Sequence, residues 1–266
     1  MIPTGGVKAA GYGIPTPAER RALDRAVDVI RVRYQRWTRW RMASILASTR
    51  DEILASEDPS ESVFLAAVMR HDEAMRSTLT RMLREVYPMA ASIAVPDDVI
   101  KSWNVYEVKA VDQRLWDLVE KLVGRSITAI DDTTLHHVRT AYIQSQGDVE
   151  AFRRLLLQSP AFSPARARTI AVTETNVAIN DSIYSASEEL DRDRERIIVW
   201  CTTLRLNVRE THQMMEGAVV PFGEYFHVPL LKGGYDLMLH PGDTLHGAHP
   251  ENFINCFCKG FPRYVS

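Results

Sequence analysis

The sequence predicts an α+β protein, with a mainly α-helical N-terminal body followed by a small loop-rich α+β module at the C-terminus. Up to about residue 190, apolar residues recur at helical spacing behind helix-capping residues. After Arg196 the pattern changes to short β-branched runs between glycines and prolines, which is typical of short strands and turns. We expect a flexible arm (residues 1–15), a helical domain (16–160) and a C-terminal module (161–266) that opens with a helix.

The composition indicates a folded protein with an ordinary core. Of 266 residues, 45% are hydrophobic and 25% are charged, and the net charge of −2 gives no general attraction to nucleic acid or membranes. No apolar run approaches the ~20 residues that cross a bilayer, and the first residues lack a signal-peptide pattern. Three cysteines, two of them one residue apart, do not form a disulfide framework. We therefore expect synthesis in a reducing cytoplasm.

The first helix is predicted to begin at Thr16-Pro17, after the glycine-rich arm. Thr16 is a typical N-cap, Pro17 suits the first helical position, and Glu19 completes a capping box. One face of the helix then carries apolar residues at steps of three and four: Leu23, Val27, Ile30, Tyr34 and Trp37.

Arginine crowds the other faces of this helix, with eight arginines between residues 18 and 41. One interpretation is a solvated basic face around a core stripe. The other is a surface that binds phosphate or an acidic protein ring, with aromatic side chains as anchors. The candidate contact residues are Arg31, Arg33, Arg36, Trp37, Arg39, Trp40 and Arg41.

Proline and glycine divide the rest of the helical body. Asp58-Pro-Ser-Glu61 is expected to cap a helix that runs toward Tyr87, and Pro88 and Pro96 to bound a short connector. Two further helices are expected over residues 107–123 and 127–144, separated by Gly124.

Two more capped helices are expected before residue 190. Asp148 caps the first of them, and Ser159-Pro160 ends it. Ser163-Pro164 then starts a helix rich in small residues, which suits close packing against another helix.

The C-terminal module is predicted to contain short strands joined by turns. Ile197–Cys201 has the β-branched, continuously apolar character of a buried strand. Residues 219–220 and 225–228 are plausible further strands, each followed by proline. The glycines at 233–234 and 242 mark turns.

Five motifs follow one another in this region: residues 167–176, Trp200, Val208-Arg-Glu-Thr-His212 with Gly217, Pro241-Gly, and Asn255-Cys-Phe-Cys258. Their order resembles the phage head morphogenesis family, the minor head proteins similar to the F protein of phage Mu. The resemblance covers about residues 150–266. The chain departs from the family at residues 204–206, where an acidic residue is common, and at Phe257, which replaces a basic residue.

The resemblance implies a minor, non-enzymatic structural protein of a tailed-phage virion. Such proteins lie inside the head near the portal and assist assembly, DNA packaging or DNA delivery. The implied partners are the portal protein, the major capsid or scaffold protein and packaged DNA, without a membrane. Assembly takes place in the host cytoplasm. We expect the arm and the arginine-rich helix to contact the portal or packaged DNA.

His212, Cys256 and Cys258 are candidate zinc ligands, with His240, His246 or His249 as a fourth donor. Structural zinc sites usually space their cysteines more widely, however, and Cys-x-Cys on a strand would direct its sulfurs to opposite faces. We therefore expect no cofactor, with the cysteines as small buried apolar residues and His212 as a hydrogen-bonded core histidine, and keep zinc as the alternative.

A metal-dependent hydrolase or nuclease, or a toxin-like domain, is the alternative function. It would use His212 as a base with Cys256 and Cys258, near Glu210, Glu216 or Asp243. The sequence has no phosphate-binding loop, dinucleotide-binding glycine motif or His-Glu-x-x-His, and no spacing fixes a nucleophile. We therefore expect a structural module whose His and Cys side chains hold its loops together.

Overall fold

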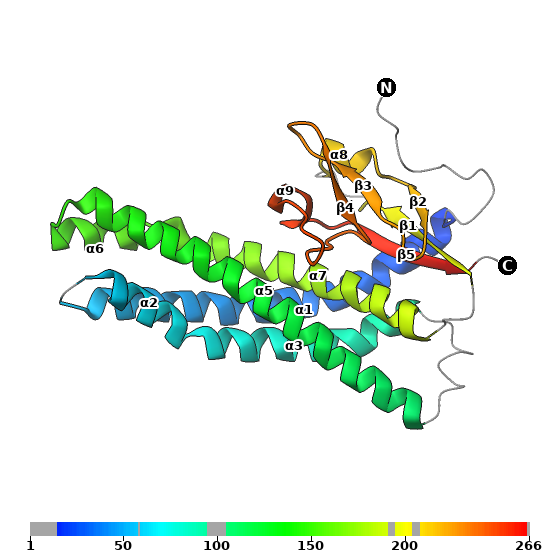
Figure 1. Cartoon of the computed structure of the whole chain (residues 1–266), viewed down its shortest axis with the longest axis horizontal. Helices are drawn as coiled ribbons and strands as arrows, with labels where there is room; N and C mark the ends of the chain where they lie inside the picture. The colour runs from blue at the N-terminus through cyan, green and yellow to red at the C-terminus, as the bar shows by residue number, and fades with distance from the viewer. Residues whose placement is uncertain (1–14, 58, 95–104, 191–194, 204–207, 265–266) are drawn as a thin grey trace.

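The computed structural model describes residues 15–57, 59–94, 105–190, 195–203 and 208–264. Over these residues, long helices form an elongated bundle, and a small module of two antiparallel sheets lies against one side of it, toward one end (Figure 1). The predicted fold class, a mainly helical body with a small α+β module, is confirmed. The predicted arm lies outside the described residues except for its last residue, Pro15. Among the described helices, none is both long and apolar enough to cross a membrane.

The helical body is built on three long helices that pack on one another, α1, α3 and α7, with α5 alongside α3. Its core is continuous from α1 through α7. The helices are α1 (Pro17–Ala55), α2 (Glu61–Arg70), α3 (Asp72–Ala94), α5 (Val105–Ser145), α6 (Val149–Leu157), the short 3-10 helix η1 (Pro160–Phe162) and α7 (Pro164–Leu190).

Helix α1 begins where the capping residues predict. The Thr16 hydroxyl accepts a hydrogen bond from the Glu19 amide at 3.3 Å, and the Thr16 amide donates to the Glu19 carboxylate at 2.7 Å. The predicted apolar stripe faces the core: Leu23, Val27, Ile30 and Tyr34 are buried and Trp37 is half-buried.

The predicted second helix is wrong in its start, its continuity and its end. Asp58 lies outside the described residues, and α2 begins at Glu61 with Ser60 as N-cap. The helix is interrupted at His71, which separates α2 from α3. Helix α3 then continues through Pro88. Proline removes one backbone hydrogen bond, but buried side chains on both sides of it, such as Val86 and Ala90, hold this segment in the core.

The two helices expected around Gly124 are one helix, α5. Glycine costs a helix only about 1 kcal/mol relative to alanine. Val123 and Ile127 on either side of Gly124 are buried in the core, so packing outweighs that cost.

Helix α7 lies between the helical body and the module, and most of its residues are buried. Ser163 caps it by accepting a hydrogen bond from the Arg166 amide at 3.1 Å, as predicted. Helices α1 and α3 pack on α7 from the body, and β5 packs on it from the module. Asn176 and Asn180 of α7 are also buried, so this helix brings polar groups into the interior.

The module contains a three-stranded sheet and a hairpin. In the first sheet β1 (Arg196–Cys201) lies between β2 (Val219–Pro221) and β5 (Lys259–Tyr264), antiparallel to both. The hairpin pairs β3 (Phe226–Pro229) with β4 (Tyr235–Met238). Short helices α8 (Glu210–Gln213) and α9 (Pro250–Phe253) complete it. Trp200, Phe226 and Met238, all buried, belong to the module's own small core. The three predicted strands correspond to β1, β2 and β3, and each begins within one residue of its predicted start.

We predict that Gly124→Ala stabilises the protein by about 0.5–1 kcal/mol. A Cβ at this position meets no atom within 4 Å, and alanine has less conformational entropy to lose on folding. Urea unfolding followed by circular dichroism measures the change, and a loss of stability would contradict a continuous α5.

Gly260→Ala is the matched substitution, and we expect it to destabilise the protein. A Cβ at Gly260 would lie 2.9 Å from Ile198 Cδ1 and 3.2 Å from Cβ of His240 and from Cδ of Pro241. Such overpacking costs about 1–3 kcal/mol, measured in the same experiment.

Candidate metal centre

The three predicted metal ligands lie together inside the module. His212 comes from α8, and Cys256 and Cys258 come from the segment between α9 and β5. Each sulfur lies 3.5 Å from His212 Nδ1, and the three donor atoms lie within 4.8 Å of one another. All three side chains are buried, with exposed fractions of 1%, 4% and 2%. They are the one such group among the residues that the structure describes.

The expectation that the two sulfurs point apart is wrong because the cysteines do not lie on a strand. They precede β5, which begins at Lys259, in irregular backbone. Asn255, immediately before them, has a positive φ of 54°, and the Cys256 amide donates to the Phe253 carbonyl at 3.1 Å. Strand alternation therefore does not apply, and both sulfurs can face His212.

Helix α7 holds the cysteine segment from both ends. Before the cysteines, the Asn255 amide donates to the Thr173 hydroxyl at 3.1 Å. After them, the Asn180 side chain donates to the Cys258 carbonyl at 3.1 Å and accepts from the Gly260 amide at 3.0 Å. These buried hydrogen bonds fix the backbone on which the sulfurs are mounted.

A hydrogen-bond chain fixes the protonation of His212. The Asn252 amide nitrogen donates to Asp236 at 2.8 Å, so the amide oxygen faces His212 Nε2, 3.2 Å away. An oxygen there requires a proton on Nε2. Nδ1 faces the two sulfurs and is the ring nitrogen that would bind a metal. His249 Nδ1 lies 2.6 Å from the other Asp236 oxygen and extends the chain.

The two cysteines are electrostatically unequal. The hydrogen bond from the Cys258 thiol, together with His212, holds the pKa of Cys256 well below its usual value in spite of burial. The same hydrogen bond and burial raise the pKa of Cys258. By contrast, burial raises the pKa of Cys201 to about 12, so that cysteine is a neutral thiol. The pair therefore favours one negative charge beside His212, and a thiolate next to an imidazole is a donor set suited to a soft cation.

None of the three histidines proposed as a fourth donor belongs to this group, so that expectation is wrong. Each lies against a carboxylate instead, which holds it away from the sulfurs. The pairs are His240 with Asp181 at 3.4 Å, His246 with Asp243 at 2.7 Å and His249 with Asp236 at 2.6 Å. The described residues thus offer three protein donors to a tetrahedral metal.

Arg31 does not belong to the predicted contact surface, because it is buried. Its Nε donates to the Asn176 side chain at 2.8 Å, its Nη1 pairs with Asp28 at 2.7 Å, and its guanidinium lies over the Phe257 ring at 4.9 Å. Arg31 thus joins α1 to α7 and to the cysteine segment.

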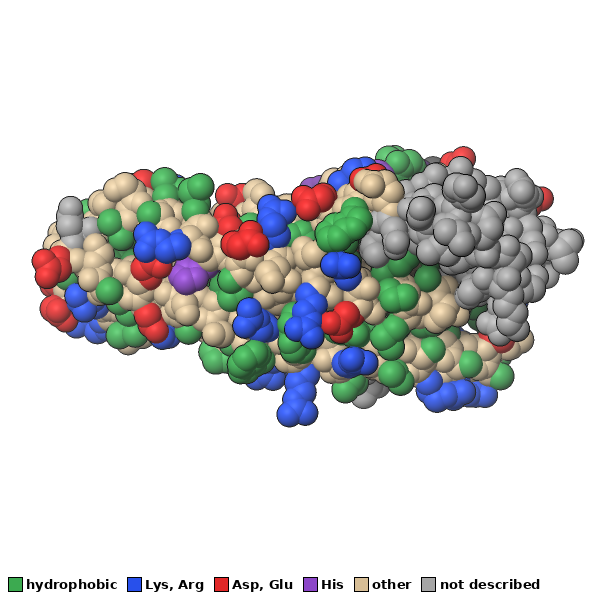
Figure 2. All heavy atoms as spheres, turned by 90° about the horizontal axis from the view of Figure 1, so that it is seen from below, with side chains coloured by type: hydrophobic (Ala, Val, Ile, Leu, Met, Phe, Trp, Pro, Cys, Tyr) green, Lys and Arg blue, Asp and Glu red, His purple; other side chains and the backbone are tan. Residues whose placement is uncertain are grey.

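The other predicted contact residues remain on the surface of α1. Arg33, Arg36, Arg39 and Trp40 are exposed, and Trp37 and Arg41 are half-exposed. On the face seen from below, basic side chains lie among acidic and apolar ones and do not form an unbroken basic patch (Figure 2).

Sequence patterns missed the polar residues around the centre. Asn252 and Asp236 orient His212, although no spacing links them to it. His240 and Asp181 form a second buried pair, between α7 and the turn after β4. Burial opposes a charge on His240, but Asp181 outweighs burial and raises the pKa of His240 to about 9. The signal that could have found Asp181 is an acidic residue in a stretch of small and apolar residues.

We predict that His240→Gln lowers stability by about 3 kcal/mol at pH 6, because it removes the imidazolium that pairs with the buried Asp181 carboxylate at 3.4 Å. The pKa of His240 is raised in the folded protein, so its stabilisation is complete below about pH 6.5 and is lost as pH rises through about 9. The difference between wild type and variant should shrink over that interval in urea unfolding at a series of pH values. A difference independent of pH would contradict the assignment.

The centre draws its residues from α7, α8, β4, α9 and the segment before β5, parts of the chain that include the motifs described above. No protein-family model, no curated protein and no solved structure matches the chain.

Proposed function

We propose that this chain is a minor head protein of a tailed phage that lies inside the procapsid near the portal. There it assists head assembly and DNA packaging or delivery. The observation that supports the proposal is that the sequence motifs lie close together in the folded protein. Motif residues far apart in sequence, among them Thr173, Trp200, His212 and the two cysteines, surround one buried centre. A chance order of motifs gives no reason for such convergence.

In this proposal the module is structural, and zinc is the metal it takes. His212 Nδ1 and the sulfurs of Cys256 and Cys258 are the ligands. Bound zinc would neutralise the thiolates and cross-link α8 to the segment before β5. Because the module's core is small, such a tie contributes substantially to its stability.

The burial of the donors favours this role over the alternative of a metal-dependent hydrolase, nuclease or toxin-like domain. A catalytic zinc keeps a position that substrate and water can reach. Here the three donors are at most 4% exposed, and the Trp200 and His212 rings pack in a T-shaped arrangement with centroids 5.6 Å apart.

Contacts with the portal, the major capsid or scaffold protein, or packaged DNA are assigned to the exposed part of α1. Trp40 is 65% exposed, and Arg33 and Arg36 lie on the surface near it in sequence. A large exposed aromatic side chain among arginines is typical of a binding surface.

We predict one zinc ion per chain in protein purified under reducing conditions, measured by inductively coupled plasma mass spectrometry. His212→Ala and Cys258→Ser should each lose the metal and melt at lower temperature. Cys201→Ala removes a buried thiol outside the centre and should keep the metal. Metal-free wild-type protein whose melting temperature a chelator leaves unchanged would contradict the zinc assignment.

We predict that the triple variant Arg33→Glu, Arg36→Glu, Trp40→Ala reduces the number of copies in purified phage heads by about tenfold, because it removes the surface anchors without touching the core. Quantitative mass spectrometry of heads counts the copies. Arg153→Glu, Arg154→Glu, Leu157→Ala on α6 is the matched control and should enter heads normally.

Two outcomes separate the parts of this proposal. Normal incorporation of the α1 variant would place the contact elsewhere on the chain. Absence of the wild-type chain from heads would overturn the proposed function itself.

A further inference from the structure

A hollow of about 450 Å³ lies where α1, α7 and the cysteine segment meet. Phe257, which lies between the two cysteines, and Asn255 line it, but His212 and the cysteines themselves do not. It is therefore separate from the candidate metal centre, although both use the same segment. Its other lining residues are Arg39 of α1 and Pro164, Ala165, Arg168, Thr169 and Val172 of α7.

The charge of this hollow is one-sided. Arg39 and Arg168 line it, no carboxylate of the described residues does, and the lining therefore carries a charge of +2. Both side chains are exposed, and neither forms an ion pair with a described residue. An anion in the hollow would face two guanidinium groups and no carboxylate of the described lining.

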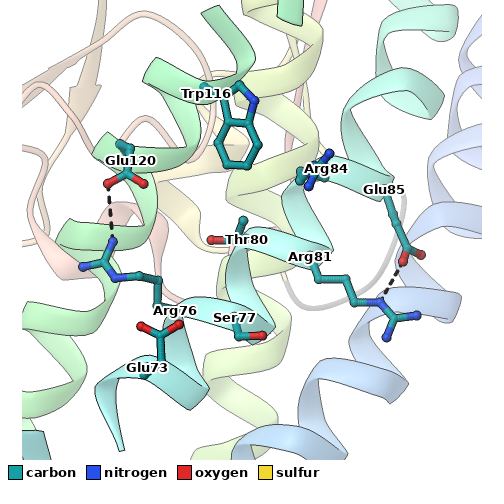
Figure 3. Close-up of a pocket in the computed structure, with 9 residues that line it drawn as sticks. All are labelled: Glu73, Arg76, Ser77, Thr80, Arg81, Arg84, Glu85, Trp116 and Glu120. Atoms are coloured by element: carbon teal, nitrogen blue, oxygen red, sulfur yellow. Dashed lines mark hydrogen bonds and ion pairs between the residues drawn. The ribbon is translucent and has the colours of Figure 1, made fainter. Parts of the chain in front are cut away.

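A larger hollow, of about 670 Å³, lies between α3 and α5 and lacks this property (Figure 3). Three arginines line it, but three glutamates do as well, so its net charge is zero. Arg76 pairs with Glu120 at 3.4 Å and Arg81 with Glu85 at 2.9 Å, as the dashed lines in Figure 3 mark. Because its own glutamates balance its arginines, this larger hollow has no preference for an anion.

The remaining lining of the smaller hollow adds a ring-binding wall and hydrogen-bonding groups. Phe257 is half-buried and held under the Arg31 guanidinium, so its ring is fixed before any ligand binds. Val172 and Pro164 extend the apolar wall, whereas Thr169 and Asn255 offer a hydroxyl and an amide. Arginine recognises phosphate through paired N–H groups, and aromatic side chains stack on bases.

We propose that this hollow binds a phosphate ester that carries a planar ring, which is the chemistry of a nucleotide. Arg39 and Arg168 hold the phosphate, and Phe257 lies against the ring. A free nucleotide and a nucleotide within a nucleic-acid strand share this chemistry. The site depends neither on zinc nor on the proposed head-protein function.

The test is isothermal titration calorimetry of the full chain with adenosine monophosphate. Arg39→Gln and Arg168→Gln should each weaken binding about tenfold or more, the usual loss for a charge-assisted hydrogen bond. Both side chains are exposed, so the fold should survive, which thermal melts check. Arg153→Gln on α6 is the matched control and should bind normally.

Three further titrants separate the contributions of the phosphate and the ring and distinguish a free nucleotide from a strand. Adenosine, which lacks the phosphate, should bind at least tenfold more weakly than adenosine monophosphate, and so should inorganic phosphate, which lacks the ring. Phe257→Leu should weaken binding of the nucleotide but not of inorganic phosphate. A short single-stranded DNA oligonucleotide separates the sources, since tighter binding than the mononucleotide identifies a strand and weaker binding a free nucleotide.

Two results would overturn the site. One is an absence of binding by both the mononucleotide and the oligonucleotide at millimolar concentration. The other is binding that Arg39→Gln and Arg168→Gln both leave unchanged.

Discussion

Helix α7 is buried between the helical body and the module, and this burial determines how the two parts are joined. A helix packed on one side by other helices and on the other by a sheet has no solvent to satisfy its polar side chains. Each buried polar group must therefore find a partner. Two residues of α7 find those partners in the module: Thr173 accepts from the Asn255 amide, and Asn180 bonds the Cys258 carbonyl and the Gly260 amide, on both sides of Lys259. The hydrogen bonds that satisfy α7 also position the sulfurs of the candidate metal centre.

Helix α1 joins the same two parts through charge. Lys259 is 2% exposed at the start of β5, and its ammonium group pairs with Asp24 of α1. Arg20 pairs with Glu216 of the module, and Arg31 is buried against α7. Removing one member of a buried pair is costly, because the other keeps its charge without water. Part of the arginine excess in α1 therefore serves the interior of the protein, which a count of charges along the helix does not distinguish from a binding face.

Local signals predicted those features that local interactions decide. Thr16 caps α1 as its sequence indicates, because the capping box is complete within four residues. The predicted helix ends at Gly124 and Pro88 were wrong. The free-energy cost of glycine or proline in a helix is smaller here than the stabilisation from burying the surrounding helical residues. The three candidate metal ligands were predictable from their residue types, but their geometry was not. The sulfurs converge because of irregular backbone, and His212 is oriented by Asn252, forty residues away in sequence. Contacts at that separation leave no periodicity in a sequence.

Because β5 is the last described element along the chain, its contacts with β1 and α1 span long stretches of sequence. Strand β5 completes the sheet beside β1, and its first residue pairs with Asp24 across 235 residues of sequence. Until β5 docks, Asn180 of α7 lacks its partner Gly260 and Asp24 of α1 lacks its partner Lys259, although the helical body can already be assembled. Contacts of such long separation carry a high loop-closure entropy and form late. The last strand of the described chain thus joins a sheet beside a helical body whose long helices all precede it in sequence.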